Sequence, residues 1–166
     1  MLGLYENFPR TAHRIKHYVK LTSNRNLQQK LTQTLHILNT QTFSLEKVTD
    51  VSIPECVTSF EFGIAQTNDF NYLDDGETEM LMKTINKNPL QVMDFLCVVR
   101  YHRLRGQKKR PLRFDYSFIR FSFTKKQVDV QVFHERGPRH TSPEDVLNFI
   151  VNKVNEESLN RALREI

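Results

Sequence analysis

Tryptophan is absent from this chain of 166 residues, and cysteine, glycine and proline are scarce, with two, five and six residues. The cysteines, Cys56 and Cys97, lie far apart in apolar surroundings, which argues against a disulfide framework or a zinc ribbon and predicts two buried thiols. Because no linker rich in glycine or proline and no internal repeat is found, we expect a single domain over residues 1–166.

Long hydrophobic runs are also missing. No segment approaches the roughly 18 consecutive apolar residues of a membrane-spanning helix. The N-terminal sequence MLGLYENFPR lacks the basic start and long apolar stretch of a secretory signal. We therefore expect an intracellular protein of the cytoplasm or nucleus that has no membrane partner.

The common enzyme signatures are absent as well. The chain contains no G-x-x-x-x-G-K-[ST] phosphate loop, no G-x-G-x-x-G, no G-x-S-x-G and no H-E-x-x-H motif. His13 and His17 have the spacing of a helical zinc half-site, but their surroundings alternate like a strand and no further ligand follows at a familiar distance. We therefore assign no catalytic residue, no metal site and no cofactor.

Two periodicities predict the secondary structure. In the first strand, Ile15, His17, Val19 and Leu21 alternate with Arg14, Lys16, Tyr18 and Lys20, as on a strand with one buried and one solvated face. Leucines then recur every three or four positions from Leu27 to Leu38, as on the buried stripe of a helix. The same reasoning predicts strands over 56–64, 93–104, 112–123 and 128–132, a weaker strand over 42–48, a loop over 68–76, and a helix over 77–87.

The last helix has the clearest start. Ser142 is a suitable cap, Pro143 occupies the first helical position, and Asp145 follows the cap by three residues. We expect the helix to bury Val146, Phe149, Ile150 and Val154 and to extend toward Leu159, Leu163 and Ile166.

The predicted element order is β-α-β-β-α-β-β-β-α. Consecutive strands without crossover helices favour an α+β fold with a mostly antiparallel sheet and helices packed on one face. The sequence leaves two forms of the sheet open, an open sheet and a half-open barrel.

Positive charge is concentrated in one segment. The chain has a net charge of +5, yet residues 100–113 alone carry seven cations and no acid, so the remainder is slightly negative. We expect a hairpin whose cations bind phosphates while Tyr101 stacks on an unpaired base. The predicted nucleic-acid-binding residues are Arg100, Tyr101, Arg103, Arg105, Lys108, Lys109, Arg110 and Arg113.

A second group of cations precedes the last helix. Arg136, Arg139 and His140 stand beside Gly137-Pro138, a turn that would hold them close to the free backbone N–H groups of the helix start. This arrangement predicts a second anion-binding site formed by Arg136, Arg139 and His140.

Three functions are compatible with these features. The first is a small non-catalytic module that binds nucleic acid, RNA or DNA, through the basic hairpin. The second is a scaffold subunit of a multiprotein complex, or a homodimer, that docks on an acidic protein surface through the hairpin and an aromatic sheet face containing Phe121, Phe123 and Phe133. The third is an acid/base hydrolase acting on nucleic acid, in which acids from the predicted strands converge with His102 or His134. The candidate acids are Glu61, Asp94, Asp115 and Asp129.

Overall fold

The fold is described by a computed structural model that covers residues 1–10, 14–49, 55–105, 108–156 and 161–166; the side chains of residues 14–15 and 104–112 are outside this description. The elements follow the order β1 (Arg14–Lys20), α1 (Asn24–Leu38), β2 (Thr42–Ser44), α2 (Leu45–Val48), β3 (Cys56–Gln66), β4 (Asp69–Tyr72), α3 (Asp75–Lys87), β5 (Val92–Arg105), β6 (Lys108–Phe123), β7 (Gln127–Arg136), α4 (Pro143–Glu156) and β8 (Leu163–Glu165).

All eight described strands belong to one antiparallel sheet. Its order is β2-β3-β5-β6-β7-β1-β8, and β4 pairs with β3 beyond the end of β2. The predicted α+β class with a mostly antiparallel sheet is confirmed, and the sheet is open rather than closed into a barrel.

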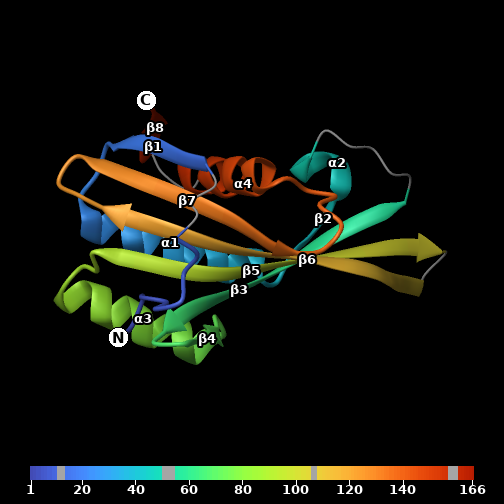
Figure 1. Cartoon of the computed structure of the whole chain (residues 1–166), viewed down its shortest axis with the longest axis horizontal. Helices are drawn as coiled ribbons and strands as arrows, with labels where there is room; N and C mark the ends of the chain where they lie inside the picture. The colour runs from blue at the N-terminus through green and yellow to red at the C-terminus, as the bar shows by residue number, and fades with distance from the viewer. Residues whose placement is uncertain (11–13, 50–54, 106–107, 157–160) are drawn as a thin grey trace.

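The main core lies between the sheet and its helices. Phe60 on β3 stacks on Phe149 of α4 with ring centres 5.4 Å apart, and Phe121 on β6 is buried beside α1 and α4. Figure 1 shows α1 and α4 behind the sheet, while the N-terminal segment crosses in front of it. We call the sheet side that faces the helices the helix face and the opposite side the outer face.

No helix in the described ranges is both long and apolar enough to cross a membrane.

The structure decides which side of β1 is buried. Tyr18 pairs with Val128 on the helix face and is 2% exposed, whereas His17 pairs with Asp129 and is exposed on the outer face. Burial, followed by repulsion from Glu165, raises the pKa of the Tyr18 hydroxyl to about 12. The side of β1 that carries Lys16 and Tyr18 therefore faces the helices. The Tyr18 ring and the aliphatic part of the Lys16 side chain provide apolar surface there, although both side chains end in a polar group.

Three elements differ from the sequence prediction. Residues 163–165 do not extend α4 but form β8, which pairs with β1. The expected polar loop over 68–76 contains β4, which pairs with residues 63–66. The weak strand over 42–48 is a three-residue strand followed by the short helix α2. β8 depends on β1, which is distant in sequence, whereas β4 forms a tight hairpin with the end of β3 across polar residues that lack a strand-like apolar alternation.

The N-terminal segment is fixed to the outer face. The N–H of Gly3 donates to the carbonyl of Ala65 at 2.7 Å, and the carbonyl of Gly3 accepts from the N–H of Asp94 at 2.6 Å. Gly3 has φ +88°, and a Cβ there would lie 2.8 Å from the carbonyl oxygen of Val92, so this close approach requires glycine. Tyr5 then packs against Phe118 on β6, with ring centres 5.3 Å apart.

A buried ion pair holds this segment in place. Asp94 is fully buried, and its carboxylate accepts from Nε and Nη2 of Arg120 at 2.7 and 2.8 Å. The same carboxylate accepts from the N–H of Tyr5 at 2.7 Å, and Arg120 also donates to the Tyr5 carbonyl and lies over the Phe8 ring. Because a buried carboxylate is costly without partners, this pair fixes the segment to the sheet.

We predict that Arg120→Met destabilises the fold by about 3 kcal/mol, because it leaves the Asp94 carboxylate buried without its ionic partner. Urea unfolding followed by circular dichroism measures the change. The matched control is Arg164→Met on exposed β8, expected within about 0.5 kcal/mol of the wild type. Equal stability of the two variants would contradict this role for Asp94 and Arg120.

Candidate functional site

The strands β5 and β6, which carry the basic segment, pair with each other and project from the body. Figure 1 shows β5 and β6 extending together beyond the helices. Their register pairs Arg103 with Arg110 and Arg105 with Lys108, so like charges occupy opposite positions on the two strands. Arg103 and Arg113 are exposed, whereas the side chains of Arg105, Lys108, Lys109 and Arg110 lie outside the described residues. Opposed cations destabilise a strand pair, and an anion bound between them would relieve this repulsion.

Tyr101 is not available for stacking on a base. Its side chain is fully buried on the helix face, and the His140 ring packs edge-on against it with ring centres 5.0 Å apart. The predicted stacking role of Tyr101 is therefore corrected, because an unpaired base can only stack on an exposed ring face.

A different group of rings occupies the base of the hairpin. Arg100, Phe114, Tyr116 and Arg136 form an arginine–aromatic cluster on the outer face. Arg100 pairs in register with Phe114, and its guanidinium carbon lies 4.9 Å from the centre of that ring. Tyr116 pairs with Arg136, whose guanidinium carbon lies 4.2 Å from the Tyr116 ring centre. The Phe114 and Tyr116 rings meet edge-to-face with centres 6.3 Å apart. Ring faces and guanidinium planes are the groups on which unpaired bases stack.

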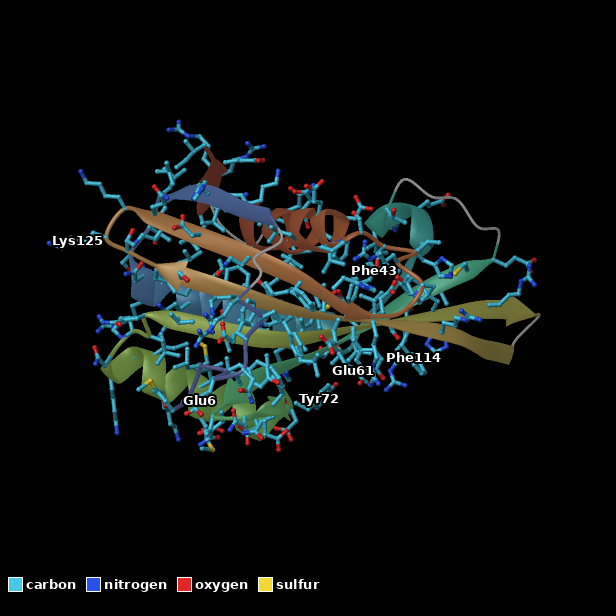
Figure 2. The ribbon with its side chains drawn as sticks, viewed as in Figure 1. Glu6, Phe43, Glu61, Tyr72, Phe114 and Lys125 are labelled. Atoms are coloured by element: carbon cyan, nitrogen blue, oxygen red, sulfur yellow. The ribbon has the colours of Figure 1, made fainter. Side chains whose placement is uncertain are left out.

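One acid lies within this cluster. The carboxylate of Glu61 on β3 lies 2.9 Å from Nη2 of Arg100, and both side chains are about 40% exposed. Figure 2 labels Glu61 and Phe114, which lie on the same side of the sheet where the hairpin leaves the body. Arg100, predicted as a free phosphate-binding cation, is therefore ion-paired with Glu61 and contributes mainly a fixed guanidinium plane.

An extra residue in β7 explains why Arg136 joins this cluster. The register shifts between Tyr116 and Ser117, so that Tyr116 pairs with Arg136 while Ser117 pairs with His134. Such a bulge reverses the alternation of side chains beyond it. As a result, His134 points to the helix face and Arg136 to the outer face, although regular alternation would place both on one side.

The loop before α4 does hold an anion, but that anion is the chain's own Asp115. The backbone N–H groups of Arg139 and His140 donate to the Asp115 carboxylate at 2.7 and 3.1 Å. Gly137 makes this possible at φ +119°, since a Cβ there would lie 2.4 Å from Oδ1 of Asp115. The predicted anion site of Arg136, Arg139 and His140 is corrected accordingly: Arg136 lies on the other face of the sheet, and the loop N–H groups already have a partner.

Asp115 is the centre of a buried polar network. It is 1% exposed and also accepts from the Tyr101 hydroxyl and from Nε2 of His134, the latter at 3.0 Å. The Tyr101 oxygen in turn accepts from the N–H of Thr141 at 3.0 Å. Burial raises the pKa of the Asp115 carboxyl, but the hydrogen bonds from Tyr101, His134 and Arg139 outweigh it and keep that pKa below its usual range. Burial and the bond to Asp115 raise the pKa of Tyr101.

The network brings an acid and a histidine together, as the hydrolase hypothesis requires. However, Nδ1 of His134, the ring nitrogen not bound to Asp115, lies 3.2 Å from Nε of Arg139, which donates to it. Both ring nitrogens of His134 are therefore engaged in hydrogen bonds. Nδ1 could accept a proton from a substrate only after its hydrogen bond from Arg139 is broken.

The outer face carries one further histidine pair but no metal cluster in the described ranges. Nδ1 of His17 lies 2.7 Å from Asp129, whereas His13 lies outside the described residues. Across the part of the chain that the structure describes, no three His, Cys, Asp or Glu side chains converge to bind a metal ion.

Sequence reasoning missed Phe114 and Tyr116 as functional candidates. Alternation along β6 puts them on one face with Phe118, but both faces of β6 are apolar, and alternation does not show which part of a face stays uncovered. Tyr5 and Phe8 of the N-terminal segment pack on Phe118, and Phe114, Tyr116 and Phe118 are all partly exposed. Phe121 and Phe123 from the predicted aromatic docking face are instead buried under the helices.

Comparison of the chain with protein-family models, with curated proteins and with solved structures found no match. Its function is therefore inferred from its own residues.

We predict that Asp115→Asn destabilises the fold by about 2–3 kcal/mol at neutral pH, because four donors lose a charged acceptor. Since folding lowers the pKa of Asp115, its stabilisation is complete above the ordinary value near 3.8 and is lost as the pH falls through the folded value. The difference between wild type and variant, measured by urea unfolding, should therefore shrink below about pH 4. A difference that stays constant into strong acid would contradict this assignment.

Proposed function

We propose that this chain is a small non-catalytic module that binds single-stranded nucleic acid along the outer face. The hairpin would neutralise phosphates, and the arginine–aromatic cluster would stack bases. The observation that carries the proposal is the position of the two cation–ring pairs at the base of a projecting hairpin that bears paired cationic positions.

The two parts of this surface have complementary roles. Arg103 and Arg113 are exposed where the hairpin joins the body, and the register pairs Arg103 with Cys56 of the helix face. On the outer face, Arg136 lies over Tyr116. Phosphate contacts provide affinity without base information, whereas stacking on a ring requires a base that is free of its complement. A preference for single strands over duplex is therefore expected, with slight sequence preference.

The alternative partner, an acidic protein surface, would use the same cations but not the rings. A flexible acidic peptide therefore serves as the competing ligand: if it binds as tightly as an oligonucleotide of equal charge, nucleic-acid binding is rejected in favour of protein docking.

We predict that a fluorescently labelled single-stranded oligonucleotide binds in an anisotropy titration and loses roughly 10- to 50-fold in affinity between 50 and 200 mM salt. Lys108→Ala with Lys109→Ala should weaken binding about fivefold and reduce the salt dependence. The matched control is Lys125→Ala with Lys126→Ala, which removes the same charge from the far end of the sheet (Figure 2) and should bind like the wild type. Equal losses in both double variants would show that only the net charge matters and would reject the hairpin as the site.

We predict that Glu61→Gln tightens binding about two- to fivefold, because it removes a negative charge from the cluster while keeping an acceptor for Arg100. The same titration measures the change, and Glu79→Gln on the exposed face of α3 is the matched control. A gain in affinity is not produced by partial unfolding. Unchanged or weaker binding by Glu61→Gln would place the nucleic acid away from the cluster.

A further inference from the structure

A cavity of about 300 Å³ lies on the helix side of the sheet, between β1, β7 and the start of α4. Its apolar wall consists of Val132, Pro143 and Leu147. Lys16, His134 and Arg139 supply most of its polar lining, together with Ser142 and Glu144 at the start of α4. The β7 bulge separates this cavity from the arginine–aromatic cluster, because it turns His134 toward the helices and Arg136 away from them.

The position of Arg139 is set by its backbone. Its φ is +57°, an uncommon conformation for a residue with a side chain, and its N–H is bound to Asp115 at 2.7 Å. Its Nε donates to Nδ1 of His134 at 3.2 Å. No carboxylate of the described residues lies within ion-pair distance of the Arg139 guanidinium, which leaves its Nη groups as donors at an exposed position.

Hydrogen bonds also fix the ring of the neighbouring His134. His134 has a side chain only 7% exposed, and its Nε2 faces Asp115 at 3.0 Å. Since Asp115 holds its charge, Nε2 is the donor and Nδ1 is the acceptor from Arg139. Asp115 therefore orients Arg139 through both the backbone N–H and the His134 ring.

Arg139 is the cation of the lining that carries the case for an anion. Lys16 also lines the cavity, with its ammonium 2.8 Å from Glu165 on β8. Glu144 is an acidic residue of the lining, and Glu165 already offsets the charge of Lys16, so an anion would meet chiefly the Arg139 guanidinium. Cavities for small molecules typically combine apolar walls with a few polar groups that fix orientation, which is the composition found here.

We propose that this cavity binds a small organic oxyanion, a phosphate or carboxylate carried on an apolar body. The oxyanion would lie against the Arg139 guanidinium with Lys16 as the second cation, and the apolar body would pack on Val132, Pro143 and Leu147. This site lies on the opposite face from the proposed nucleic-acid surface and does not depend on it.

The test uses phenyl phosphate as the probe and benzyl alcohol as its uncharged counterpart. Amide resonances of the ¹⁵N-labelled full chain are followed during titration of each compound. Phenyl phosphate should shift the resonances of Val132, His134, Arg139 and Leu147 in a saturable manner, while benzyl alcohol should bind at least tenfold more weakly because it lacks the charge.

Variants assign the binding to this cavity. Arg139→Gln keeps the backbone N–H that holds Asp115 and should weaken phenyl phosphate binding at least tenfold, and Lys16→Gln should weaken it about threefold. The matched control is Arg25→Gln on the exposed surface of α1, which should bind like the wild type. If Arg139→Gln does not fold, Lys16→Gln alone decides. Absence of saturable shifts, equal binding of benzyl alcohol, or equal effects of Lys16→Gln and Arg25→Gln would each overturn the proposal.

Discussion

The burial of one charged carboxylate, that of Asp115, determines the arrangement of the half of the molecule that carries both proposed sites. A carboxylate removed from water must receive hydrogen bonds from several donors. Here the donors come from β5 through Tyr101, from β7 through His134, and from the backbone of the loop before α4. The contacts join three strands to the loop from which the last helix begins. They also require glycine at position 137, whose backbone passes against Asp115 too closely for any side chain.

The second constraint is the extra residue in β7. Without it, His134 and Arg136 would lie on the same face of β7. With it, the sheet presents two unlike surfaces within a few residues: an exposed outer face where arginines lie over rings, and an enclosed helix face where a histidine is oriented by a buried acid. Two chemically distinct sites can thus be built from one short segment of chain.

Much of the architecture could be predicted from the sequence, because alternation and helical spacing report which residues share a surface. The last helix was predicted from Ser142 and Pro143, and the three strands before it from their apolar patterns. Which of these surfaces is covered by other parts of the chain could not be predicted from the sequence. Tyr18, Tyr101 and Asp115 are buried because partners distant in sequence meet their polar atoms or cover their rings. Phe114 and Tyr116 remain partly exposed on the outer face, where the N-terminal segment packs on Phe118. The basic segment could be recognised from the sequence, whereas the arginine–aromatic cluster could be recognised only from the three-dimensional register.

The two margins of the sheet have a consequence for self-association. Open sheets leave unpaired backbone groups at their outermost strands, and long flat margins recruit further chains into aggregates. Here one margin is β8, three residues long with exposed Arg164 and Glu165, and the other includes β2, also three residues long. Margins this short, one of them also charged, offer a second copy little backbone to extend. A partly exposed aromatic surface can therefore exist on this sheet without promoting growth of the sheet from molecule to molecule.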